Sequence, residues 1–241
     1  MGLSDLFKKS SATPKCSAVI VAAGSSTRMG SDKLLAELGG IPVLARTLHA
    51  FEKSEYVNEI VVVTRMDKVT EIADLCAQYG CSKVSKVVAG GKTRMESSLI
   101  GVSAVKSSAK LIAIHDAARP LVSDAVIKRT VCAAAEYMAA VPVIPSTDTL
   151  KVVNDADRIV GTIDRSTAFR VQTPQVFEAV LIKGALSNAA KKGLALTDDS
   201  AAMDMTGFKT YTVAGEEDNI KITTPRDLVI TEAILKSREE L

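Results

Sequence analysis

A glycine- and serine-rich segment with two cations follows the first strongly apolar run of the chain. Residues 22–35 read AAGSSTRMGSDKLL, where Arg28 lies between Gly24 and Gly30 and Lys33 follows. Small residues let a backbone approach a polyphosphate, N–H groups can donate to its oxygens, and cations can neutralise a departing pyrophosphate. The spacing matches neither GxGxxG nor GxxxxGK[ST], which argues against a dinucleotide site and an ordinary ATPase site. The segment predicts a triphosphate-binding loop, and a solvated Gly/Ser loop is the alternative.

A second candidate group is HDAARP, residues 115–120, which follows another apolar run. Asp116 and Arg119 should emerge at the ligand-binding edge of a sheet, or else form a buried structural ion pair. His115 is interpreted as a packing or supporting residue, because two histidines in the whole chain make a histidine-based metal or hydrolase centre improbable.

The elements that must position these residues are short β-branched runs alternating with helical patterns. The runs are SAVIVAA from Ser17, EIVVVT from Glu59, LIAIHD from Leu111 and AVPVIP from Ala140. They are apolar on both faces, as parallel strands covered by helices are. Helical spacing follows Ile41 and begins again at Asp67, Arg94 and Asp124. The alternation predicts an α/β fold with a Rossmann-like, doubly wound, mostly parallel sheet, whose ligands bind beyond the carboxyl ends of the strands.

Residues 149–165, TLKVVNDADRIVGTIDR, break this rhythm and predict a β-hairpin arm that projects from the sheet. An isolated hairpin is marginally stable in water, so its apolar side chains need a covering surface. A partner subunit is the expected cover, which makes 149–165 a dimerisation arm. The remaining expectation is a disordered tail over 1–15 and a single domain over 16–236.

Composition excludes several other classes of protein. Apolar residues make up 47% of the 241 residues, the net charge is +2 and aromatics are 4% without Trp. Neither a nucleic-acid binder nor a membrane protein is expected, because basic clusters, stacking aromatics and a long apolar run are all missing. The four cysteines have no CxxC pair or nearby His, so reduced thiols in a cytoplasmic protein are expected.

Later motifs extend the first segment into an ordered series. They are AGGKTRMESS at 89–98, HDAARP at 115–120, STDTLK at 146–151, TIDRSTAFRVQTPQVF at 162–177, LTDDSAA at 196–202 and DNIKITTPRDL at 218–228. Over residues 17–235 the chain resembles the 2-C-methyl-D-erythritol 4-phosphate cytidylyltransferase family of the non-mevalonate isoprenoid pathway. AAGSSTRMGSDK alone is also similar to the loop of molybdopterin nucleotidyltransferases.

The resemblance implies a role for individual residues. CTP would be bound by Ala22, Ala23, Gly24, Gly91 and Ser97, and the catalytic cations would be Arg28, Lys33, Arg165 and Lys221. The acceptor would contact Asp116, Arg119, Thr149, Thr173 and Thr197, with Arg165 and Lys221 also near its phosphate. Asp198 and Asp199 receive no role, because they fit helix caps equally well.

The implied reaction transfers CMP from CTP to 2-C-methyl-D-erythritol 4-phosphate. An acceptor phosphate oxygen attacks the α-phosphorus in line, with Mg²⁺ held mainly by the CTP phosphates and no protein metal ligands. Two alternatives stay open: a cytidylyltransferase for ribitol 5-phosphate, and a non-catalytic nucleotide-binding protein of the same fold.

Overall fold

The structure is a computed structural model that describes residues 13–24 and 32–240. The predicted triphosphate loop therefore lies partly outside the described residues, and so does most of the predicted tail. The central sheet contains β1 (Cys16–Val21), β4 (Val57–Thr64), β5 (Val84–Ala89), β6 (Leu111–Asp116), β7 (Ala139–Pro145), β10 (Phe169–Val171), β11 (Gln175–Glu178) and β12 (Tyr211–Ala214). The helices are α1 (Val43–Lys53), α2 (Val69–Gln78), α3 (Arg94–Ala104), α4 (Asp124–Tyr137), α5 (Ala179–Lys191), α6 (Ser200–Asp204) and α7 (Pro225–Ser237). Short elements are the pair β2 (Glu37–Leu38) and β3 (Ile41–Pro42), and the 3-10 turns η3 (Met66–Lys68) and η4 (Arg165–Thr167).

The sheet is mixed, with a parallel centre. Its order is β10-β7-β11-β6-β1-β4-β5, and β12 pairs in parallel with β7. The strands β6, β1, β4 and β5 run parallel, whereas β10 and β11 are antiparallel to their neighbours. Ala140 pairs with both Val176 and Tyr211, so β11 and β12 lie on opposite edges of β7. The predicted strands and the mostly parallel sheet are confirmed.

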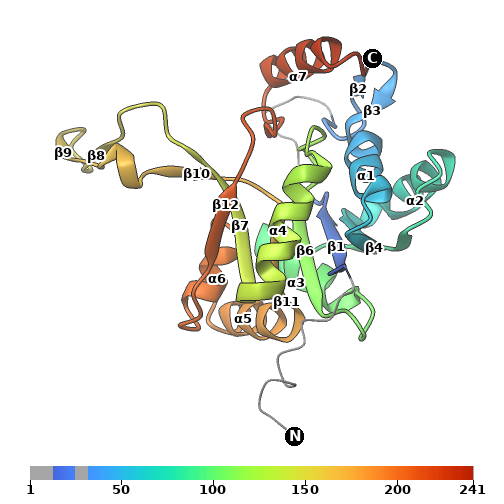
Figure 1. Cartoon of the computed structure of the whole chain (residues 1–241), viewed down its shortest axis with the longest axis horizontal. Helices are drawn as coiled ribbons and strands as arrows, with labels where there is room; N and C mark the ends of the chain where they lie inside the picture. The colour runs from blue at the N-terminus through green and yellow to red at the C-terminus, as the bar shows by residue number, and fades with distance from the viewer. Residues whose placement is uncertain (1–12, 25–31, 241) are drawn as a thin grey trace, which may run out of the picture.

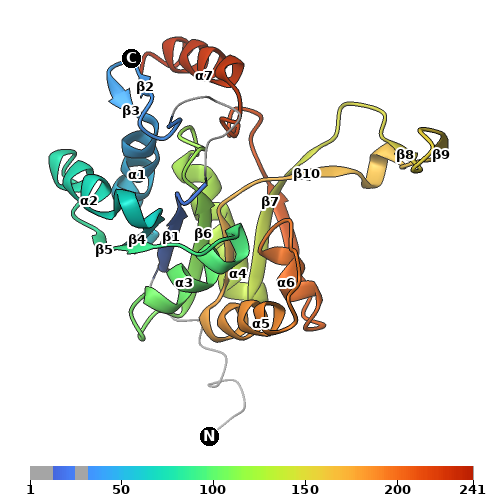
Figure 2. The same ribbon diagram turned by 180° about the vertical axis from the view of Figure 1, so that it is seen from behind.

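Alternate residues of the central strands face two separate cores. Ala18 and Ile20 of β1 pack in a core with α1, α2, α4 and α7, whereas Val19 packs in a second core with α3, α5 and α6. Figures 1 and 2 show these two helical layers on opposite faces of the sheet. Strands buried on both faces explain the continuous apolar runs in the sequence. The doubly wound arrangement is confirmed.

The helix α3 lies unusually close to the sheet. A Cβ at Gly101, in the middle of α3, would collide with the side chains of Val19 and Val63. Thr93 starts this helix by accepting a hydrogen bond from Glu96 N at 3.1 Å. Glycine and cap together set where the first turn of α3 meets the carboxyl ends of β1 and β6.

The predicted arm extends away from the sheet as the antiparallel pair β8 (Lys151–Val153) and β9 (Ile159–Thr162). Figures 1 and 2 show it beyond the end of β7, without contact to the helical layers. Its apolar side chains are exposed: Val152 45%, Val153 52%, Ile159 64%, Val160 60% and Ile163 42%. The hairpin and its uncovered apolar surface are confirmed.

Among the helices of the described residues, none combines the length and apolarity that crossing a membrane requires.

Candidate functional site

A pocket of about 320 Å³ lies at the carboxyl ends of β1 and β6. Its walls contain eight residues that the sequence predicted for the site: Ala22, Ala23, Gly24, Lys33, Gly91, Ser97, Asp116 and Lys221. Arg28 lies outside the described residues. The pocket occupies the sheet edge where ligands of doubly wound folds bind.

A larger cavity of about 800 Å³ lies at the opposite, amino-terminal edge of the sheet. Its lining includes Lys15, Ser17, Glu59 and Lys106. Glu59 is already satisfied there, because its carboxylate accepts from Ser17 Oγ, Ser85 Oγ and Lys106 N at 2.7 to 3.1 Å. Chemistry is therefore assigned to the smaller pocket, where several cations surround a carboxylate.

One end of the pocket is a tight backbone turn at Gly90 and Gly91. A Cβ at Gly90 would lie 2.7 Å from both Ala23 Cβ and Ser97 Oγ, so only glycine fits. The buried Ser97 hydroxyl accepts from Gly91 N at 3.2 Å and donates to Thr93 O at 2.9 Å. Ser97 thus lines the pocket as predicted, and its proton is used to shape the turn.

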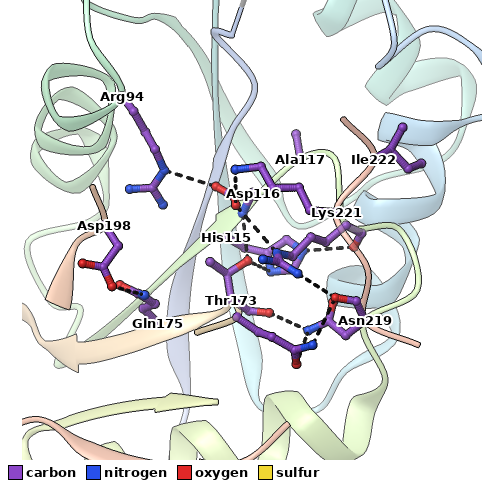
Figure 3. A network of polar contacts seen from close by, with 12 residues as sticks. Arg94, His115, Asp116, Ala117, Thr173, Gln175, Asp198, Asn219, Lys221 and Ile222 are labelled. Carbon is purple, nitrogen blue, oxygen red and sulfur yellow. Dashed lines mark hydrogen bonds and ion pairs between the residues drawn. The ribbon is translucent and has the colours of Figure 1, made fainter. Parts of the chain in front are cut away.

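Asp116 ends β6 and is the centre of the charged wall (Figure 3). Its Oδ1 lies 3.2 Å from Arg94 Nε, and its Oδ2 lies 2.8 Å from Lys221 Nζ and 3.7 Å from Arg119 Nε. Burial alone would raise the pKa of Asp116, but Arg94, Lys221 and Arg119 together hold that pKa well below its usual range. The carboxylate is charged at neutral pH and has opposite charges on both oxygens.

The segment 219–222 brings the two predicted lysines to this wall. Lys33 Nζ donates to Ile222 O at 2.9 Å, which links the residues after the first loop to the C-terminal motif. Arg119 Nη1 donates to Asn219 O at 2.6 Å. Arg119 was predicted to contact the acceptor. In the structure it ties the segment 219–222 to β6 and is not in the pocket lining.

A hydrogen-bond chain supports Asp116 from below. Asp116 N donates to Thr173 Oγ1 at 3.1 Å, and Thr173 Oγ1 lies 3.0 Å from His115 Nδ1. Arg119 O can only accept, so the neutral imidazole carries its proton on Nε2, which donates to Arg119 O at 3.1 Å, and Nδ1 accepts the proton of the Thr173 hydroxyl. Burial lowers the pKa of His115 to about 3, so the imidazole is neutral. The supporting role interpreted for His115 is confirmed, and Thr173 lies beneath the pocket.

Besides Arg119 and Thr173, three further predicted residues are not in the lining of this pocket. Thr149 and Arg165 are exposed at the base of the arm, where Arg165 Nη2 donates to Thr149 Oγ1 at 3.1 Å. Thr197 is exposed on the segment before α6. The hydrogen bond joins Arg165 to Thr149, and neither side chain contacts Asp116.

Arg94 is a charged pocket residue that the sequence analysis missed, and Lys92 in the same lining is another. Arg94 is the first residue of α3, and its Nη2 lies 2.8 Å from Asp199 Oδ2 in addition to the contact with Asp116. A cation in the first turn of a helix opposes the helix dipole. This unfavourable position of the Arg94 charge, within the motif at residues 89–98, could have indicated a functional role from the sequence.

The neighbouring aspartates have different roles. Asp198 caps the start of α6, because its carboxylate accepts from Ala201 N at 3.1 Å and from Ser200 Oγ at 2.7 Å. Asp199 makes no cap hydrogen bond and instead pairs with Arg94. The capping interpretation is confirmed for Asp198 and wrong for Asp199.

Over residues 13–24 and 32–240, no three His, Cys, Asp or Glu side chains are grouped so that they could hold a metal ion. Cys16, Cys76, Cys81 and Cys132 are free thiols, as expected.

Known proteins resemble this chain over nearly its whole length. The family model described as IspD, 2-C-methyl-D-erythritol 4-phosphate cytidylyltransferase, matches residues 16–237. Relatives of that name from Caldanaerobacter subterraneus and Halalkalibacterium halodurans are 41% and 40% identical, over 91% and 92% of this chain and 98% of each relative. The crystal structure of 4-diphosphocytidyl-2C-methyl-D-erythritol synthase from Anaerococcus prevotii is 30% identical with a TM-score of 0.83, covering 93% of this chain and 97% of its own. The Thermus thermophilus 2-C-methyl-D-erythritol 4-phosphate cytidylyltransferase structure is 32% identical with a TM-score of 0.74, covering 92% and 99%.

The buried imidazole predicts a specific dependence of stability on pH. Its folded pKa of about 3 lies below the ordinary value of 6.5, so between these values the unfolded chain binds more protons and stability falls as pH falls. Between pH 7 and pH 5 the unfolding free energy of the wild type should fall by about 2 kcal/mol more than that of His115→Gln. Denaturant titrations at both pH values measure the difference. An equal decrease in unfolding free energy between pH 7 and pH 5 for the two proteins would contradict a neutral, buried His115.

Proposed function

The chain belongs to the 2-C-methyl-D-erythritol 4-phosphate cytidylyltransferase family, and we propose that it transfers CMP from CTP to 2-C-methyl-D-erythritol 4-phosphate. The products are 4-diphosphocytidyl-2-C-methyl-D-erythritol and pyrophosphate. The observation that carries this proposal is the pocket itself, where a charged carboxylate and several cations face a wall of small residues. Phosphoryl transfer requires mainly positioning and charge neutralisation, and these residue types provide both.

CTP would lie along the wall of small residues. The cytosine lies at the Gly91 and Ser97 end, where backbone groups read the edge of the base. Ala22 and Ala23 lie at the same cytosine end, and the triphosphate lies beside Gly24. Arg28 and Lys33 neutralise charge on the departing pyrophosphate.

The acceptor lies at the Asp116 end of the pocket. The Asp116 carboxylate accepts a hydrogen bond from an acceptor hydroxyl, and Lys221, Thr197 and an Arg165 side chain hold the acceptor phosphate. Thr173 and Arg119 hold Asp116 and the segment 219–222 in place from below. One phosphate oxygen forms a bond to the α-phosphorus of CTP while the bond from that phosphorus to the bridging oxygen of the β-phosphate breaks. The acceptor phosphate is already ionised, so the step needs no general base.

Mg²⁺ fits this pocket as an ion carried by the nucleotide. Both oxygens of Asp116 have cations at 2.8 and 3.2 Å, so the donor set suits an ion held mainly by CTP phosphates and water. Bound there, it would neutralise charge on the phosphate oxygens.

A homodimer in the cytoplasm, without nucleic acid or membrane partners, completes the proposal. The exposed apolar side chains of the arm favour burial against a second copy. Phe169 and Val171 of β10, adjacent to the arm, are 50% and 43% exposed and extend the same apolar surface. An arm that crosses to its partner would carry Arg165 and Thr149 to the partner's pocket.

Steady-state pyrophosphate release with several nucleoside triphosphates and polyol phosphates tests the reaction. CTP with 2-C-methyl-D-erythritol 4-phosphate should exceed every other pair at least about tenfold in kcat/KM, because a site that hydrogen-bonds one base penalises others. Lys221→Ala should lose about a hundredfold, the effect of one preorganised charge, whereas the exposed Lys236→Ala should stay near wild type.

Each contrary outcome of this assay has a separate meaning. Comparable turnover with GTP or ATP would overturn the nucleotide assignment. Preference for ribitol 5-phosphate would replace the acceptor. No release with any pair would leave a nucleotide-binding protein without this activity.

Mixed dimers test whether the active site is shared between subunits. Lys221→Ala and Arg165→Ala chains are unfolded, mixed in equal amounts and refolded. If Arg165 acts on the partner's pocket, half of the dimers are mixed and each has one intact site, so about a quarter of wild-type activity should return.

The matched control mixes Lys33→Ala with Lys221→Ala. Lys33 and Lys221 both belong to the pocket of their own chain. Every site in that mixture therefore has one of the two substitutions, and no activity should return. Failure of the first mixture to recover, with mixed dimers verified by mass spectrometry, would mean that Arg165 acts within its own chain.

A further inference from the structure

Arg94 has two carboxylate partners from different parts of the chain. Figure 3 shows its side chain directed from α3 toward Asp116, on the side of the pocket opposite Lys221. Its Nε lies 3.2 Å from Asp116 Oδ1 and its Nη2 lies 2.8 Å from Asp199 Oδ2. With Lys221 on the other oxygen of Asp116, four side chains form a row of alternating charge: Asp199, Arg94, Asp116 and Lys221.

Asp199 is the unusual member of this row. Its side chain is 1% exposed, and Arg94 is its only ion-pair partner among the described residues. A buried charge with few partners costs several kcal/mol, so such a carboxylate is weak evidence for a purely stabilising role. Burial raises the pKa of Asp199 while Arg94 opposes the increase. The Asp199 carboxylate holds Nη2 of the Arg94 guanidinium. Because the guanidinium is rigid, Nε, which faces Asp116, is then held in place as well.

The fixed guanidinium determines the orientation of Asp116. A carboxylate can rotate about its last side-chain bond, but here Arg94 holds Oδ1 and Lys221 holds Oδ2. A lysine could not replace Arg94, because an ammonium is a point charge, whereas the planar guanidinium can reach two carboxylates in fixed directions. The ion pair between Arg94 and Asp199 also joins α3 to the segment before α6, which contains Thr197.

We infer that Arg94, held by Asp199, is a positioning residue that orients the Asp116 carboxylate toward the acceptor alcohol. This inference rests on the proposed function, because it requires Asp116 to contact the acceptor. It assigns to Arg94 no contact with the reacting atoms. Its loss should therefore affect use of the acceptor more than use of CTP.

The test compares Arg94→Lys with the wild type in the pyrophosphate assay. We expect kcat/KM for 2-C-methyl-D-erythritol 4-phosphate to fall about tenfold or more, the effect of losing one charge-assisted hydrogen bond, with the KM for CTP changed less than about twofold. Asp199→Asn should change the acceptor parameters in the same direction by a smaller factor, because Arg94 keeps its contact with Asp116. Arg129→Lys, which alters an ion pair with Glu216 outside the pocket, should match the wild type.

A double-mutant cycle separates positioning from general stabilisation. In an Asp116→Asn background, Arg94→Lys should cost less than about twofold further, because the group it orients is already altered. Additive losses, or equal losses for both substrates, would overturn the inference while wild-type turnover still supports the proposed function. If Arg94→Lys does not fold, as judged by thermal melting, Asp199→Asn takes its place in the same cycle. Absence of wild-type turnover would overturn the proposed function and this inference with it.

Discussion

The rest of the site depends on the ion pairs between the Asp116 carboxylate and the cations around it. A buried charge of this kind is tolerated only when cations replace the water that it loses. Here those cations come from three separate segments: Arg94 from the first turn of α3, Arg119 from the loop after β6, and Lys221 from the segment before α7. One acidic residue at the end of a buried strand therefore holds together three regions that are distant in sequence.

The fold provides the rigid frame that this arrangement requires. Apolar packing on both faces fixes β1 and β6, and the close approach of α3 at Gly101 places Arg94 beside the end of β6. The chain through Thr173 and His115 uses neutral hydrogen bonds beneath the carboxylate, so that no further charge is buried there. Rigid elements thus hold the charged groups, while the arm leaves the sheet and carries its own cation, Arg165.

Sequence patterns predicted the parts of the molecule that depend on local rules. Apolar runs indicated β1, β4, β6 and β7, and helical spacing indicated α1 to α4, because burial on both faces and 3.6-residue periodicity leave direct traces in the sequence. The short β10 was not predicted, because its three residues are exposed and leave no buried apolar pattern in the sequence. It is a strand only because it pairs with β7. The pairing of Arg94 with Asp199 was missed for a related reason. Aspartate is equally suited to capping a helix, and only the three-dimensional proximity of Arg94 to Asp199 and to the end of β6 decides between the two roles.

We propose that CTP binds at the carboxyl ends of β1 and β6, against the cations that surround Asp116. A crystal structure of the protein with CTP and Mg²⁺ tests it most directly. Cytosine should lie at the Gly91 and Ser97 turn, with the triphosphate beside Lys33. Density for CTP in the larger cavity at the opposite edge of the sheet, among Lys15, Glu59 and Lys106, would contradict it.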